Sequence, residues 1–75
     1  MAHVRCYAGA SYPERPVAFE LEGQWLEVVE VLRQARVPEG LLFEVLAQDG
    51  RRYRLAWDAR TDEWAVMSAS GNSFA

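Results

Sequence analysis

Two residues near the N-terminus have the chemistry of a nucleophile and its base. His3 and Cys6 are the only histidine and the only cysteine of the chain. A catalytic thiol needs an adjacent base that a third group holds in place. Because no acid or amide is evidently placed to orient His3, the sequence predicts no catalytic residues and a protein that is not an enzyme.

Three carboxylates, those of Asp58, Asp62 and Glu63, gather in the C-terminal third of the chain. Carboxylate oxygens bind divalent cations, but surface turns are commonly acidic and the spacing is not that of an EF-hand. The single cysteine also excludes a Cys-x-x-Cys zinc site and an intrachain disulfide. We therefore expect no metal site and no cofactor.

The basic residues suggest a different chemistry. All eight are arginines, which is typical of proteins from GC-rich bacteria. Guanidinium groups beside aromatic rings can bind single-stranded nucleic acid by contacting phosphates while the rings stack on bases. The candidate nucleic-acid residues are Arg33, Arg36, Arg51, Arg52 and Arg54. However, eleven acidic residues give a net charge of −3, which argues against a general duplex-DNA binder, so nucleic-acid binding is the second of two hypotheses.

A small fold must position these side chains. The chain has 75 residues, which fits a single domain over 1–75 with a thin core. Glycine and proline interrupt residues 1–16, where we expect an irregular segment with at most a short edge strand from His3 to Tyr7, and residues 69–75 read as a loose tail. Because no apolar run reaches the roughly 18 residues of a bilayer span and no signal core is present, we expect a cytoplasmic protein without a membrane partner.

Hydrophobic alternation predicts a first strand in the stretch VAFELE, whose inward residues are Val17, Phe19 and Leu21. Gly23-Gln24 then predicts a two-residue type II′ turn that sets Leu21 opposite Leu26. One bulge at Val28-Val29 returns the apolar residues to the inward face of the pairing with the first strand, and it bends the chain.

The stretch from residue 25 to residue 36 has two interpretations. As a helix it would give an α+β fold, because Trp25, Val28 and Leu32 would share one stripe. Three valines and the lack of a good N-cap favour a strand. A breaker-rich loop, residues 35–40, follows in either case.

Two C-terminal hairpins have a register that the sequence can decide. A three-residue loop ending in a left-handed Gly50 makes every inward pair apolar, with Val45 opposite Tyr53. The same register sets Glu44 beside Arg54 on the outer face as a cross-strand ion pair. A four-residue loop over residues 59–62 then pairs Trp57 with Trp64. Further inward pairs are Phe43 with Leu55, Leu41 with Trp57 and Leu55 with Val66.

These elements predict an all-β domain of about five antiparallel strands, in a bent meander or a small SH3-like half-barrel. The register leaves five apolar side chains on the outer face, namely Trp25, Leu32, Leu42, Leu46 and Met67. Either the N-terminal segment with Tyr7 and Tyr12 covers this face, or another protein does. The first hypothesis for function is therefore a non-enzymatic protein-interaction module that uses this face or an exposed edge strand to bind another protein or a second copy of itself.

The segments ERPVAFELEGQWLEVVEVL and FEVLAQDGRRYRLAWDARTDEW resemble a small bacterial family. The shared pattern is Arg-Pro, an aromatic strand, a glycine, a valine-rich strand and an Asp-Gly-Arg-x-Tyr hairpin that ends in tryptophan. Similar segments occur at the C-terminus of ImuB-like proteins, which are inactive relatives of Y-family DNA polymerases. The resemblance covers Glu14 to Trp64 and implies an adaptor module linked to DNA repair, with no catalytic residues to transfer.

Overall fold

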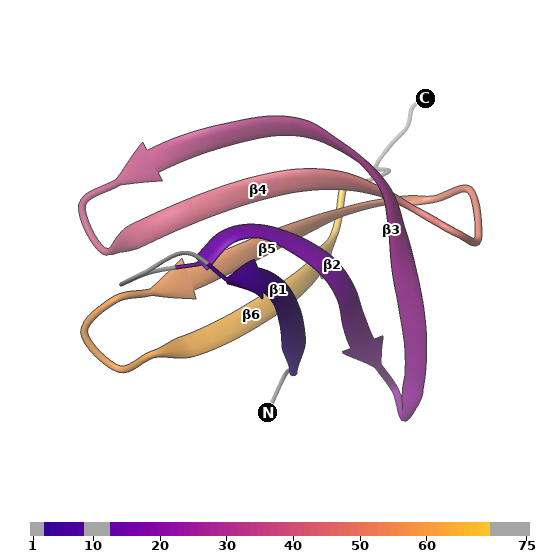
Figure 1. Ribbon diagram of the computed structural model, residues 1–75, viewed down its shortest axis with the longest axis horizontal. Helices are drawn as coiled ribbons and strands as arrows, with labels where there is room; N and C mark the ends of the chain where they lie inside the picture. The colour runs from indigo at the N-terminus through magenta and orange to yellow at the C-terminus, as the bar shows by residue number, and fades with distance from the viewer. Residues whose placement is uncertain (1–2, 9–12, 70–75) are drawn as a thin grey trace.

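The computed structural model describes residues 3–8 and 13–69, and this part of the chain forms six antiparallel strands and no helix (Figure 1). The strands are β1 (Val4–Ala8), β2 (Pro13–Leu21), β3 (Gln24–Val37), β4 (Gly40–Ala47), β5 (Arg52–Asp58) and β6 (Glu63–Ser68). Each pairs with its neighbours in sequence, in the order β1-β2-β3-β4-β5-β6. The predicted all-β half-barrel is confirmed, with six strands instead of about five. β3 covers residues 25–36, so the helical alternative is wrong.

The N-terminal segment is more regular than predicted. β1 confirms the short edge strand, but β2 begins at Pro13, inside the segment expected to be irregular. Pro13 and Pro16 pair with Ala8 and Cys6, next to two register shifts of the ladder. Proline is tolerated at such irregular edges because ladder hydrogen bonds are already interrupted there. Tyr12, the Tyr7 side chain and the predicted tail beyond residue 69 lie outside what the structure describes.

β3 is a strand of 14 residues that belongs to both halves of the sheet. Residues 24–27 pair with β2, whereas residues 28–37 pair with β4. The register against β4 shifts after Val28 and again after Val31, and each extra residue bends the strand. We call β1, β2 and residues 24–27 the N-terminal leaf, and residues 28–37 with β4 to β6 the C-terminal leaf. In Figure 1, β3 arches so that β1 and β2 lie over β5 and β6.

The ladder between β2 and β3 ends at the pair of Ala18 and Glu27. Continuing it would set Pro16 opposite Val29, and proline has no N–H to donate. Val29 is also the extra residue at the first register shift of β3. A bulge does lie at Val28-Val29 as predicted, but it interrupts the ladder with β4, and the predicted continuation of the pairing with β2 beyond it is wrong. Beyond this point the two leaves separate.

The first hairpin turn differs from the prediction. Its central residues are Glu22, with φ of 53°, and Gly23, with φ of 81°, and a type I′ turn requires positive φ at both positions. Leu21 pairs with Gln24, so the predicted turn at Gly23-Gln24, with Leu21 opposite Leu26, is wrong by one residue. A type I′ turn matches the twist of the strands and places glycine second, as in Asn-Gly turns.

The two C-terminal hairpins have the predicted register. Val45 pairs with Tyr53, and Gly50 has the left-handed φ of 81° that the three-residue loop requires. Trp57 pairs with Leu41 on one side and with Trp64 on the other. The row of large apolar side chains expected across three strands is therefore confirmed.

The connection between β3 and β4 is shorter than the predicted loop over residues 35–40. β3 continues to Val37 and β4 begins at Gly40, which leaves Pro38 and Glu39 as a two-residue turn. A Cβ atom on Gly40 would collide with the Trp57 carbonyl oxygen. Glycine at this position lets the turn pack closely against the end of β5.

The core lies between the two leaves. Phe19 of β2 is fully buried, and its ring centroid lies 5.0 Å from that of Tyr53 on β5, which joins the leaves. Ala18 lies on the face opposite the predicted inward residues of this strand, and it is buried because it lies between Arg5 and Glu27, its partners on the adjacent strands. The buried cluster consists of Phe19, Leu41, Phe43, Val45, Ala47, Tyr53 and Leu55.

Candidate binding groove

His3 and Cys6 do not have the properties of a catalytic pair. Nδ1 of His3 lies 2.9 Å from Oε1 of Glu20, an acid that the sequence analysis did not identify as its partner. Burial raises the pKa of the Cys6 thiol to about 11, so the sulfur is protonated and a poor nucleophile at neutral pH. Glu20 lies beside His3 only because β1 pairs with β2, and no local sequence pattern predicts that pairing.

The acidic residues near the last turn interact within that turn. Asp58 accepts hydrogen bonds from the Arg60 backbone and guanidinium, and the side-chain bond lowers the pKa of Asp58. Asp62 accepts a hydrogen bond of 2.8 Å from Nε1 of Trp57. Across residues 3–8 and 13–69, no group of three or more metal-binding side chains comes together. These carboxylates fix the turn and hold Trp57.

The five candidate arginines do not share one face. Arg36 is the partner of the inward residue Leu41, so it lies on the inner face of the sheet, opposite the other candidate arginines that lie on strands. Arg51 lies in the turn before β5. The arginines on the outer face of the C-terminal leaf are Arg33, Arg52 and Arg54.

Tyr53 lies between two of these arginines but is directed into the core. The residue is 4% exposed, and its hydroxyl donates a 2.7 Å hydrogen bond to Asp49. The register confirms that Glu44 is the partner of Arg54, but the predicted ion pair between them is wrong, since their charged groups are not in contact. Long exposed side chains gain little from such pairs in water.

The five outer apolar residues are exposed or half-buried, but charged residues divide them. Trp25 and Met67 are each 47% exposed and Leu32 is 38% exposed. Trp25 belongs to the N-terminal leaf, where the Arg5 guanidinium lies 5.3 Å from its ring centroid. The half-buried Leu42 and Leu46 share β4, with Glu44 between them on the same face.

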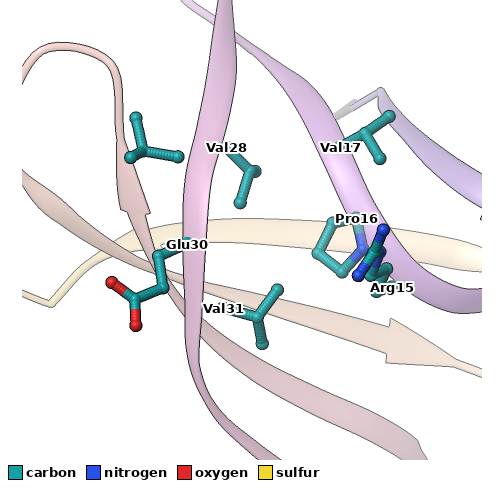
Figure 2. Close-up of a pocket in the computed structure, with 7 residues that line it drawn as sticks. Arg15, Pro16, Val17, Val28, Glu30 and Val31 are labelled. Atoms are coloured by element: carbon teal, nitrogen blue, oxygen red, sulfur yellow. The ribbon is translucent and has the colours of Figure 1, made fainter.

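A groove of about 420 Å³ opens where the leaves separate, between β2 and β3 (Figure 2). Val28 and Val31 point from β3 toward the buried Pro16 of β2, whereas the carboxylate of Glu30 lies on the other side of β3 (Figure 2). We call this the valine groove. It is lined by Arg15, Pro16, Val17, Val28, Val29, Glu30 and Val31.

Val29 is a candidate contact residue that the sequence analysis missed. It is 64% exposed, the highest value among the exposed large apolar residues of the described chain. The available signal was the run Val28-Val29-Glu30-Val31, which holds one apolar residue too many for simple alternation. A bulged residue leaves the alternation and reaches solvent.

β3 has a free backbone edge beside the groove. Residues 28–37 pair with β4 on one side, and none of the described strands pairs with them on the other. In an antiparallel ladder alternate residues direct their N–H and C=O groups away from the partner, so some of these groups face the open side. Such an edge is a template for an added strand.

No protein-family model, curated protein or solved structure matches this chain. The resemblance of residues 14–64 to the C-terminal segments of ImuB-like proteins therefore stays a prediction. No helix in the described part of the chain has the length and apolar character to cross a membrane. The function is accordingly inferred from the groove, the free edge and the charges around them.

Proposed function

We propose that the chain is a non-enzymatic, cytoplasmic protein-interaction module that binds an extended segment of another protein as a strand on the free edge of β3. The observation that carries this proposal is the coincidence of the free edge, residues 28–37, with the valine groove. Strand addition gains affinity from main-chain hydrogen bonds and specificity from pockets for alternate side chains. Here the groove between Val31 and Pro16 would receive an apolar side chain.

Exposed apolar residues at both bulges extend this site. Val29 and Leu32 are 64% and 38% exposed, and both lie on β3 beside its free edge. Their burial under a partner would contribute about 25 cal/mol for each Å² of apolar surface removed from water. Of the outer residues, Leu32 therefore joins the proposed site, whereas Met67 on β6 lies apart from it.

The test is a selection of peptides of about ten residues, the length of a strand along the free edge, from a display library. Selected peptides should shift the NMR signals of the β3 amides and slow their hydrogen exchange. Val29→Glu should weaken binding, because it puts a charge beside the groove. Met67→Glu is the matched control, since Met67 is also exposed on a strand, and it should bind as the unchanged protein does.

Three results would refute the proposal. The library yields no binder, the selected peptides shift β1 or β6 and not β3, or the two variants bind equally. A second copy of the chain is one source of such a segment, and sedimentation equilibrium of the free protein measures that association.

Single-stranded nucleic acid remains the second candidate, supported by three exposed arginines on the outer face: Arg33, Arg52 and Arg54. A salt-dependent shift of the β5 amides with an oligonucleotide would favour it.

A further inference from the structure

Two opposite charges mark the free edge of β3. Glu30 and Arg33 are the partners of Leu46 and Glu44, so both lie on the outer face of the sheet. Neither side chain forms an ion pair in the described structure. Val31 lies between them and points into the valine groove (Figure 2). The edge therefore presents a negative charge, an apolar pocket and a positive charge in chain order.

From this order we infer that the segment bound at β3 contains an acidic, an apolar and a basic residue in succession, from its N- to its C-terminus. This inference rests on the proposed strand addition. An antiparallel segment would meet Arg33 first and Glu30 last, so its acidic residue would face Arg33 and its basic residue Glu30. The apolar residue between them would point to the other face and enter the groove beside Val31.

The spacing is supported by the strand that already pairs with this stretch. β4 meets Glu30, Val31 and Arg33 with three consecutive residues, Leu46, Val45 and Glu44, because the bulge at Leu32 absorbs the extra residue. A regular strand added to the opposite edge would likewise pair three consecutive residues with Glu30, Val31 and Arg33. The antiparallel direction is that of every pair in this sheet, and antiparallel ladders are slightly more stable per residue.

Cross-strand pairs of opposite charge stabilise an antiparallel ladder, and like charges directly opposite destabilise it. For two such pairs, the segment with the inferred order should bind roughly three- to tenfold more tightly than the reversed one. The selectivity should fall with added salt, because the charges are exposed.

The test uses two synthetic segments of identical composition, Thr-Val-Thr-Val-Glu-Val-Arg-Val-Thr and the same segment with Glu and Arg exchanged. Each is joined to the C-terminus of the full chain through a Gly/Ser linker of about 20 residues, whose root-mean-square length of about 25 Å suits a molecule of 37 × 24 × 22 Å. The tether raises the local concentration into the millimolar range. Slower hydrogen exchange of the β3 amides reports binding.

We expect greater protection of β3 with the Glu-Val-Arg segment, and the reverse preference in the double variant Glu30→Arg/Arg33→Glu. The matched control, Arg52→Glu/Glu63→Arg, also keeps the net charge and should retain the original preference. If both segments protect β3 equally, or if the double variant leaves the preference unchanged, the inferred charge order is refuted while strand addition stands. If neither segment protects β3, the proposed function fails as well.

Discussion

Removing the hydroxyl of Tyr53 should destabilise the domain, and the loss should depend on pH. The ring is buried, and its centroid lies 5.0 Å from that of Phe19. The hydroxyl donates a hydrogen bond of 2.7 Å to Oδ2 of Asp49. Tyr53→Phe keeps the ring and removes only this bond. A hydrogen bond of this kind contributes about 1 kcal/mol to the free energy of unfolding. In a domain of this size, that change lowers Tm by about 4–8 °C.

The pH dependence follows from Asp49. The hydrogen bond from Tyr53 is the largest cause that lowers the pKa of Asp49, followed by the bond from the Arg51 backbone N–H. A carboxyl group with a lower pKa in the folded chain stabilises the fold above its unfolded pKa, and this stabilisation is lost as pH falls through the folded pKa. The cost of Tyr53→Phe should therefore be complete at neutral pH and should decrease as the solution is acidified to about pH 3.

Urea unfolding followed by tryptophan fluorescence measures this cost. The experiment compares the unchanged protein, Tyr53→Phe, Asp49→Asn and the double variant at neutral and acid pH. Asp49→Asn removes the titrating group, so in that background the cost of Tyr53→Phe should be small and independent of pH. The reasoning is refuted if Tyr53→Phe costs the same at both pH values, or costs as much in the Asp49→Asn background as in the original one at neutral pH.

Three further substitutions test the backbone. Gly40→Ala should lower the free energy of unfolding by at least about 2 kcal/mol, because its Cβ would collide with the Trp57 carbonyl oxygen; an unchanged Tm in calorimetry would contradict the close approach. Gly50→Ala, where a Cβ meets no neighbour but φ is 81°, should cost less, about 1 kcal/mol. Glu22→Asn should stabilise the domain by roughly 0.5 kcal/mol, because asparagine accepts the left-handed turn position more readily, and a lower urea midpoint would argue against the type I′ turn.

The C-terminal hairpins could be predicted because the sequence leaves them one consistent register. Around Asp49-Gly50, only the three-residue loop pairs Val45 with Tyr53 and keeps all inward residues apolar. The aromatic pair of Trp57 and Trp64 then fixes the next hairpin in the same way. Local pattern and turn chemistry agree here, which is the condition under which sequence reasoning succeeds.

The N-terminal leaf could not be predicted to the same degree. Glu22 takes a left-handed conformation that its residue type does not favour, so the turn was placed one residue late. The valine groove depends on two events that are distant from each other in sequence. The ladder of β2 with β3 ends at Ala18, before it reaches Pro16, and β3 changes partners at the bulge of Val29. Neither feature can be predicted from the hydrophobic alternation of either strand alone.

The neighbour-only pairing of the six strands has a consequence for how the chain folds. Each ladder joins segments that follow one another directly, so hairpins can form in turn with little loss of chain entropy. The contact of Phe19 with Tyr53 is different, since it joins β2 to β5 across the two intervening strands. We expect this closure of the N-terminal leaf onto the C-terminal leaf to be the slow step of folding, and the first contact to open when the protein unfolds.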